Sequence, residues 1–245
     1  MFTAIPLRLL RHPHRLGTGI LSVIRILADQ LPATHSLADP KALLHRFDDL
    51  TTQLEQKSPT LLYNENQVQS FSTLAKELGI SVPDSVSEPL GNAPGTWTPF
   101  PDTIEGLQKL KKRYKLIILS NIDNRNIQGT VEKGLKGAEF DAVYTAQDVG
   151  SYKPSHRNFE YLFGHARKEL DVEWERGDLL HVARSLKMDH VPAKELGLRS
   201  VWISRGAEKT GEVDTYEGKL GFEWRFDTIG DFANEVEKQF AAKGL

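Results

Sequence analysis

Ser120 and Asn121 are the residues whose position in the chain most clearly indicates a ligand-binding or catalytic role. They follow an apolar run of four residues, 116–119, within the segment 115–124. A continuous run of this length is typical of a strand buried on both faces of a parallel sheet, and ligands bind beyond the carboxyl ends of such strands. The open alternative is that both residues only cap the next helix, a common role for Ser and Asn.

Two later segments contribute charged side chains. Lys153 lies in the loop 148–154, directly before a proline and ahead of a helical run. Residues 178–183 predict a second buried strand, and the loop that follows it contains Asp189. The open alternative for Lys153 is an ordinary loop lysine exposed to solvent. Nucleophilic serine chemistry is disfavoured, since the chain contains no Gly-x-Ser-x-Gly segment.

The patterns around these segments indicate the elements that must position them. Apolar residues at helical spacing predict helices near 17–28, 40–54 and 64–78, and five prolines predict a linker over 82–101. From residue 103 onward, helical and strand patterns alternate to the C-terminus. Such alternation predicts a parallel sheet with helices wound on both faces.

The order of these segments resembles the haloacid dehalogenase-like (HAD) superfamily: a strand then Ser-Asn, a loop lysine before proline, and a strand then an acidic loop. Over about residues 17–205 the chain is most similar to the type II 2-haloacid dehalogenase branch. Three segments carry the resemblance in order and spacing, TWTPFPDTIEGLQKLKKRYKLIILSN, FDAVYTAQDVGSYKP and HVARSLKMDHVPAKELGLRSVWISR. It implies an α/β fold: an atypical N-terminal segment (1–16), a helical cap (17–95) and a Rossmann-like core (96–245).

The resemblance also implies a role for each candidate residue. In this family a carboxylate attacks the halogen-bearing carbon of a 2-haloacid, and water then hydrolyses the resulting ester. Ser120 and Asn121 match the motif whose hydroxyl and backbone N–H bind a substrate carboxylate or phosphate oxygen. Lys153 matches the lysine that keeps the nucleophile ionised and screens the incoming anion. Asp189 matches the acid of the fourth motif.

The family's nucleophile is missing from this chain. The resemblance expects a strand that ends in Asp-x-Tyr-Gly-Thr, and counting back from residues 18–21 places its Asp near Arg8. The first acidic residue in the sequence is Asp29. We therefore expect a hydrolase-type chain that is inactive as written. Two alternatives stay open: a non-catalytic member that uses the residual anion pocket for binding or regulation, or a gene product with a different N-terminus.

Other positions also depart from the family pattern. Phe159 stands where dehalogenases often have Tyr, and Ser155 replaces an acidic residue. Arg46 is the candidate for the substrate-clamping arginine, with a surface residue as the alternative. His181 is expected to be a buried structural histidine, and His190 to lie at the rim of the site.

Composition limits the remaining function classes. The net charge of −2 gives no indication of nucleic-acid binding, and the absence of cysteine excludes disulfides and zinc–thiolate sites. With the first-motif acids missing, only Asp189 remains for Mg²⁺, so we expect no metal and no cofactor. We expect a small anionic substrate, no membrane partner and a cytoplasmic location, with a homodimer as an open alternative. The Arg-rich, acid-poor N-terminus leaves mitochondrial targeting as the minority alternative.

Overall fold

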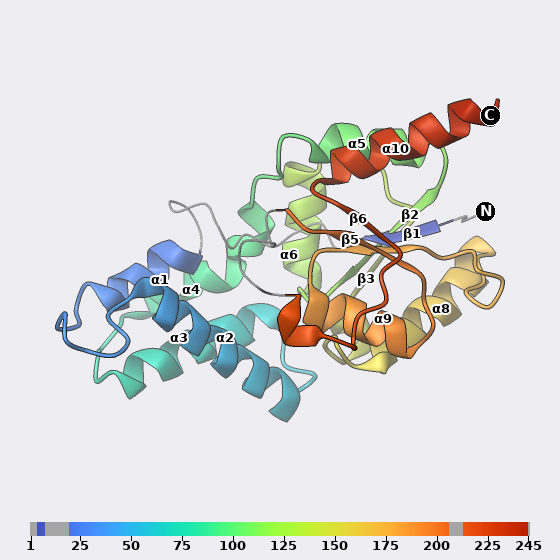
Figure 1. The fold of residues 1–245 in the computed structure, drawn as a ribbon. Coiled ribbons are helices and arrows are strands. Elements are labelled where there is room, and N and C mark those ends of the chain that lie inside the picture. The colour runs from blue at the N-terminus through green and yellow to red at the C-terminus, as the bar shows by residue number, and fades with distance from the viewer. Residues whose placement is uncertain (1–3, 8–19, 206–212, 245) are drawn as a thin grey trace.

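The computed structural model describes residues 4–7, 20–205 and 213–244, and these form a six-stranded sheet with helices on both faces and a block of helices to one side (Figure 1). The strand order is β3-β2-β1-β4-β5-β6, and all neighbouring strands are parallel. The strands are β1 (Ala4–Leu7), β2 (Lys115–Ser120), β3 (Ala142–Thr145), β4 (His181–Ala183), β5 (Ser200–Ile203) and β6 (Trp224–Phe226). The parallel sheet expected from the sequence is therefore confirmed.

Helices cover the sheet from both sides. In the core they are α5 (Thr103–Lys111), α6 (Asn124–Gly129), α7 (Ala146–Val149), α8 (His156–Leu170), α9 (Val191–Glu195) and α10 (Ile229–Ala242), with the short turns η2 (Thr130–Gly134), η3 (Leu186–His190) and η5 (Asp214–Tyr216). Strand β2 shows why its sequence has no polar alternation. Leu116 packs with α5 and α10 on one face, whereas Ile117 and Leu119 pack with α8 on the other.

Strand β1 occupies the centre of the sheet. Leu7 is in register with Ile118 of β2 and with Val182 of β4. The strands that end at Ser120 and Ala183 therefore flank the N-terminal strand. Pro6 lies inside β1 and cannot donate a ladder hydrogen bond, which is unusual for a central strand. The expected nucleophile position at Arg8 lies outside the described residues.

The helical block has its own apolar core. It consists of α1 (Ile20–Ala28), α2 (Pro40–Lys57), α3 (Tyr63–Glu77) and α4 (Asp84–Asn92), followed by η1 (Ala93–Thr96). Ile24, Phe47 and Phe71 are among the fully buried residues that join its helices. Asp39 caps α2, since its side chain accepts from the Lys41 N–H. The division of the chain at residues 16 and 95 stays a prediction.

The linker prediction for residues 82–101 is wrong in part, because α4 and η1 lie within it. The prolines at 83 and 89 suggested an irregular segment, and Pro89 does remove a helical hydrogen bond. Leu90 is nevertheless buried in the core of the helical block, and Val86 packs against it. Tertiary packing therefore overrides the local preference against a helix.

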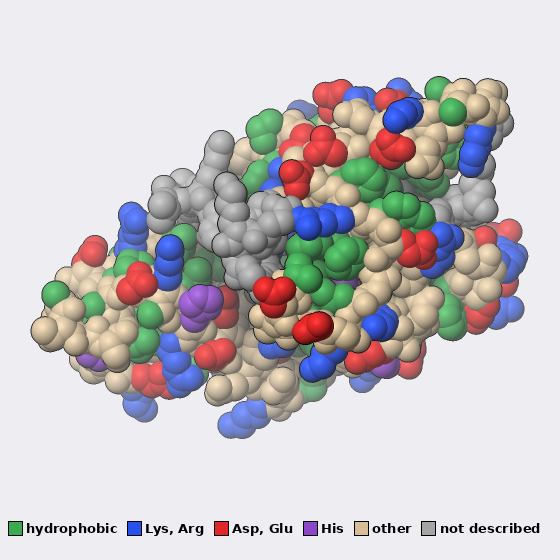
Figure 2. Space-filling view, viewed as in Figure 1, with side chains coloured by type: hydrophobic (Ala, Val, Ile, Leu, Met, Phe, Trp, Pro, Cys, Tyr) green, Lys and Arg blue, Asp and Glu red, His purple; other side chains and the backbone are tan. Residues whose placement is uncertain are grey.

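The surface carries charges of both signs. On the face shown in Figure 2, Lys and Arg side chains are mixed with Asp and Glu side chains over the helical block and the core, in keeping with the net charge of −2. Within the part of the chain that the structure describes, no helix combines the length and apolar character needed to span a bilayer.

Candidate functional site

The carboxyl ends of β2 and β4 bring Lys153 and Asp189 together. The Lys153 ammonium donates to Asp189 Oδ1 and to the Leu119 carbonyl, each at 2.7 Å. Both charged side chains are 0% exposed. An ion pair so deep in a protein offsets the cost of removing each charge from water only while both partners are present. The structure thus excludes the alternative of a solvent-exposed loop lysine.

Asn121 holds the lysine loop against the end of β2. Its Nδ2 donates to the Lys153 carbonyl at 3.0 Å, and its Oδ1 accepts from the Lys153 N–H at 2.8 Å. Because both ends of the amide are engaged, the side chain is a support for Lys153. The family motif implies that a substrate contact at this position comes from a backbone N–H.

Ser120 and Asn121 do not cap the following helix. The N-cap of α6 is Asp123, whose side chain accepts from the Asn126 N–H at 3.0 Å. The Ser120 hydroxyl instead accepts from the Ile122 N–H at 3.3 Å and remains partly exposed. The structure therefore excludes the capping alternative, and Ser120 lies beside the Lys153 loop at the carboxyl edge of the sheet.

His181 adds a contact to this cluster that the sequence did not predict. Its burial is confirmed, and its Nε2 lies 3.3 Å from Asp189 Oδ1, the same oxygen that Lys153 binds. The ring also packs edge-on against Phe159, with centroids 5.5 Å apart. Asp189 is thus shared between an ammonium and an imidazole. The only hint in the sequence was that His181 lies in the strand whose following loop contains Asp189.

The expectation that His190 lies at the site rim is wrong. His190 is fully buried, with Nε2 at 2.9 Å from the Ala183 carbonyl and Nδ1 at 3.0 Å from the Ser200 hydroxyl. Burial is the main cause that lowers the pKa of His190 to about 4. The π-helical turn η3 directs this side chain back onto β4 and β5, so it is a neutral packing residue at ordinary pH.

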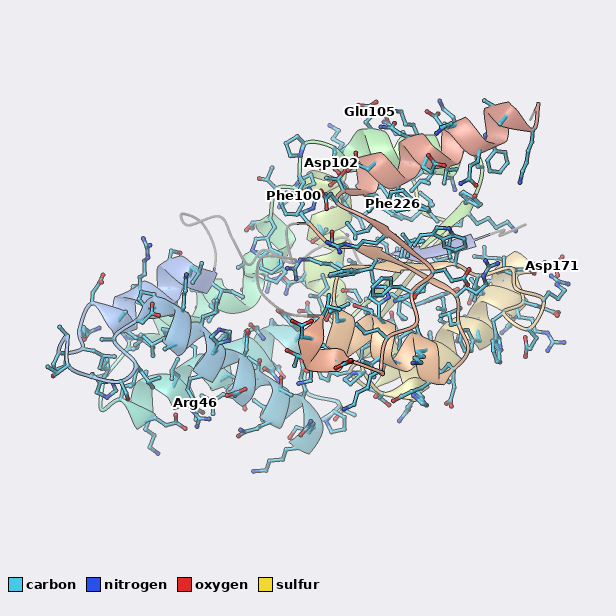
Figure 3. The ribbon with its side chains drawn as sticks, viewed as in Figure 1. Arg46, Phe100, Asp102, Glu105, Asp171 and Phe226 are labelled. Carbon is cyan, nitrogen blue, oxygen red and sulfur yellow. The ribbon has the colours of Figure 1, made fainter. Side chains whose placement is uncertain are left out.

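Arg46 lies in the helical block, where Figure 3 labels it. It forms a two-pronged ion pair with Glu77 of α3, at 3.0 and 2.6 Å. Both side chains are about one third exposed. This pairing favours the surface interpretation over a substrate clamp.

A cavity of about 370 Å³ lies beside edge strand β3. It is lined by Asn124, Ile127, Gln128, Val131, Glu132, Val143, Thr145 and Asp148. None of the four predicted site residues lines it. Among the described residues no three His, Asp or Glu side chains gather closely enough to hold a metal ion; the expectation of no metal or cofactor stays a prediction.

Comparison with known proteins connects this geometry to a family. A family model described as haloacid dehalogenase-like hydrolase matches residues 24–176. Glyceraldehyde 3-phosphate phosphatase of Methanocaldococcus jannaschii is 32% identical over 120 residues, 48% of this chain and 50% of that protein. (S)-2-haloacid dehalogenase of Pseudomonas putida is 28% identical over 138 residues, 56% of this chain and 58% of that protein. The chain thus matches between 50% and 58% of the length of these relatives.

Solved structures share the fold over nearly the whole chain. The L-2-haloacid dehalogenase from Xanthobacter autotrophicus with chloropropionic acid covalently bound has a TM-score of 0.71 at 17% identity, covering 97% of this chain and 99% of that one. At this identity the likeness concerns the fold alone. The family model, however, covers more than half of the sequence and includes both Ser120-Asn121 and Lys153. The chain therefore belongs to the haloacid dehalogenase-like hydrolase family, with relatives among dehalogenases and phosphatases.

Proposed function

We propose that this chain binds a small 2-substituted carboxylate at Ser120, Asn121 and Lys153 but does not hydrolyse it. One observation carries the proposal. Strand β1 lies between β2 and β4, and the chain continues from it as Arg8-Leu9-Leu10-Arg11, with no Asp or Glu before Asp29. The central strand is present without a carboxylate to follow it, and a guanidinium cannot attack carbon.

The acids near the site are poor substitutes for that nucleophile. Asp189 is fully buried, and one of its oxygens already contacts Lys153 and His181. Asp123 is buried and accepts from Asn64 and Asn126 through its two oxygens. A nucleophilic carboxylate needs an oxygen that can reach the substrate carbon. These two carboxylates instead have structural contacts.

Halide release tests the catalytic half of the proposal. The chain as written is expected to release no halide from (S)-2-chloropropionate above the rate in buffer, since removing a nucleophile typically costs several orders of magnitude. Replacing residues 8–12 with Asp-Leu-Tyr-Gly-Thr supplies the missing motif after β1 and should produce measurable release. Release by the unmodified chain that disappears in Lys153→Ala would overturn the proposal.

Calorimetry tests the binding half. L-lactate, which resembles the expected ligand but has no leaving group, should bind the unmodified chain. Lys153→Ala should weaken that binding by about 1–3 kcal/mol, the scale of one charged hydrogen bond. Equal affinities of both proteins for lactate would show that Lys153 is not part of an anion site.

A phosphatase is the second candidate, because one relative is a glyceraldehyde 3-phosphate phosphatase. A hydroxyl and an ammonium suit a phosphate oxygen as well as a carboxylate. Mg²⁺-assisted phosphoryl transfer, however, draws on carboxylates for the metal, and the first-motif acids are missing. We expect no Mg²⁺-dependent hydrolysis of p-nitrophenyl phosphate, and hydrolysis by the unmodified chain would favour this candidate.

A further inference from the structure

Tyr152 links the lysine loop to the helical block. It directly precedes Lys153, and its hydroxyl donates at 2.5 Å to the carbonyl of Leu61, 91 residues away in the chain. The side chain is only 6% exposed, and burial is the largest cause that raises the pKa of this phenol. Tyr152 therefore remains a neutral donor at ordinary pH. The Lys153 loop is attached in this way to residues 61–64, which lead into α3.

Asp123 links the other site loop to the same segment. It lies two residues after Asn121, and its Oδ2 accepts from the Asn64 N–H at 3.2 Å. Its Oδ1 accepts from the Asn126 N–H at the start of α6. The residue is 2% exposed. A buried carboxylate that lost these donors would retain its desolvation cost, so breaking this connection is energetically unfavourable.

The return connection from the helical block rests on the same helix. Asn126 Nδ2 donates to the Gly91 carbonyl at 2.9 Å and to Asp123 Oδ2 at 2.6 Å. Asn126 Oδ1 accepts from the Gly95 N–H at 3.0 Å. The connection between α2 and α3, at residues 61–64, is therefore bonded to the N-cap of α6, and the return connection at residues 91–95 is bonded to its first turn.

These hydrogen bonds and the short backbone segments between them form a closed circuit. Asn121 bonds the Lys153 backbone directly, and a second route runs from Asn121 through Asp123 to residues 61–64 and back through Tyr152 to Lys153. We propose that Tyr152 and Asp123 are positioning residues through which the helical block sets the placement of Lys153 and Asn121. A movement of the block that displaces residues 61–64 then displaces both site loops together.

A matched pair of tyrosine variants tests this coupling without any ligand. Tyr152→Phe removes one buried hydroxyl, and Tyr144→Phe removes another from a side chain of 5% exposure that donates to Glu169 Oε2 at 2.9 Å. The readouts are the Lys153 ammonium resonance in ¹⁵N-lysine-labelled protein and the hydrogen exchange of the Asn64 amide. Asn64 bonds Asp123 and not Tyr152, so a change there reports coupling through the segment.

The Tyr152→Phe variant is expected to shift the Lys153 resonance and to accelerate Asn64 exchange roughly fivefold, the factor equivalent to one neutral hydrogen bond. The Tyr144→Phe variant should leave both unchanged. If the two variants behave alike in both readouts, the proposal is overturned. Should Tyr152→Phe fail to fold, Asp123→Ser retains a capping side chain while shortening the acceptor for Asn64. The same displacement of the Lys153 resonance is then expected, and an unmoved resonance overturns the proposal.

A ligand arm depends on the proposed function and is kept separate for that reason. L-lactate should bind the Tyr152→Phe variant roughly fivefold more weakly than the unmodified chain, if one lost hydrogen bond is transmitted fully to Lys153. The Tyr144→Phe variant should bind lactate as the unmodified chain does. Failure of the unmodified chain to bind lactate would contradict the anion site, whereas the resonance and exchange readouts would still decide the role of Tyr152.

Discussion

Replacing Asp189 with asparagine tests the buried ion pair at the centre of the site. The charged atoms of Lys153 and Asp189 are 2.7 Å apart, and neither side chain is exposed. At an effective dielectric constant of about 20, attraction over such a distance amounts to roughly 6 kcal/mol. Asp189→Asn removes the negative charge and keeps the shape of the side chain. Lys153 then loses this attraction while its desolvation cost remains.

The expected result is a fall of about 3–5 kcal/mol in the free energy of unfolding, the usual cost of removing one partner of a buried pair. Urea titration followed by circular dichroism at pH 7 measures this difference. For a chain of this size each kcal/mol lowers the thermal midpoint by about 2–4 °C, so a fall of about 6–20 °C is expected.

Two further variants separate this explanation from a general effect of losing a charge. Glu77→Gln breaks the partly exposed pair with Arg46 and should cost less than about 1 kcal/mol. The double variant Lys153→Met/Asp189→Leu replaces the pair with apolar side chains and should recover most of the stability lost by Asp189→Asn. An Asp189→Asn variant as stable as Glu77→Gln would refute the reasoning.

Two other predictions concern the protonation of a buried histidine and the packing around two glycines. The unfolded chain takes up a proton on His190 near pH 6.5, whereas the folded chain does so only at about pH 4. The free energy of unfolding should therefore decrease as the pH is lowered from 6.5 to 4. Between pH 7 and 4.5, His190→Gln should lose about 2.5 kcal/mol less of this free energy than the unmodified chain, as measured by urea titration. Parallel pH profiles of the two proteins would contradict this. Gly91→Ala should destabilise by about 1–3 kcal/mol, because the added Cβ would meet the Asn64 carbonyl oxygen at 2.6 Å. Gly164→Ala in α8 meets no atom within 4 Å, so it should stabilise by about 0.4–1 kcal/mol, and equal thermal midpoints of the two variants would contradict the packing argument.

The central strands could be predicted from the sequence because helices cover both of their faces, which requires apolar residues at successive positions. The run 116–119 has no polar residue because helices cover both faces of β2. The strand expected at 178–183 is shorter in the structure, where β4 covers only His181–Ala183, although Leu179 and Leu180 before it are also buried. Helix α4 was missed because local signals from Pro83 and Pro89 outweighed a packing contribution that only the assembled helical block supplies.

The sequence predicted which residues form the site but not the contacts that orient them. Lys153 and Asp189 were expected in loops at the carboxyl edge, and the structure joins them. The contacts that orient them, such as Asn121 to the Lys153 backbone and Tyr152 to Leu61, connect residues 32 and 91 positions apart. No local pattern marks such pairs, because a polar side chain beside a strand end has the same appearance whether it faces water or a distant backbone.

The pairing of strand β1 leads to a last prediction, which rests on the proposed absence of the nucleophile. Its four residues pair with β2 although Pro6 cannot donate. If a carboxylate added after β1 lies beside Lys153, as the proposed site requires, it shares one ammonium with Asp189, and two acids that share one cation repel each other. The variant with Asp-Leu-Tyr-Gly-Thr at residues 8–12 should thus gain halide release and lose stability, on the order of 2 kcal/mol at pH 7. Urea titration at pH 7 and pH 5 measures the loss, which should shrink at the lower pH as the added carboxylate takes up a proton. A grafted protein that released halide with undiminished stability at pH 7 would show that Lys153 can accommodate a second carboxylate without repulsion.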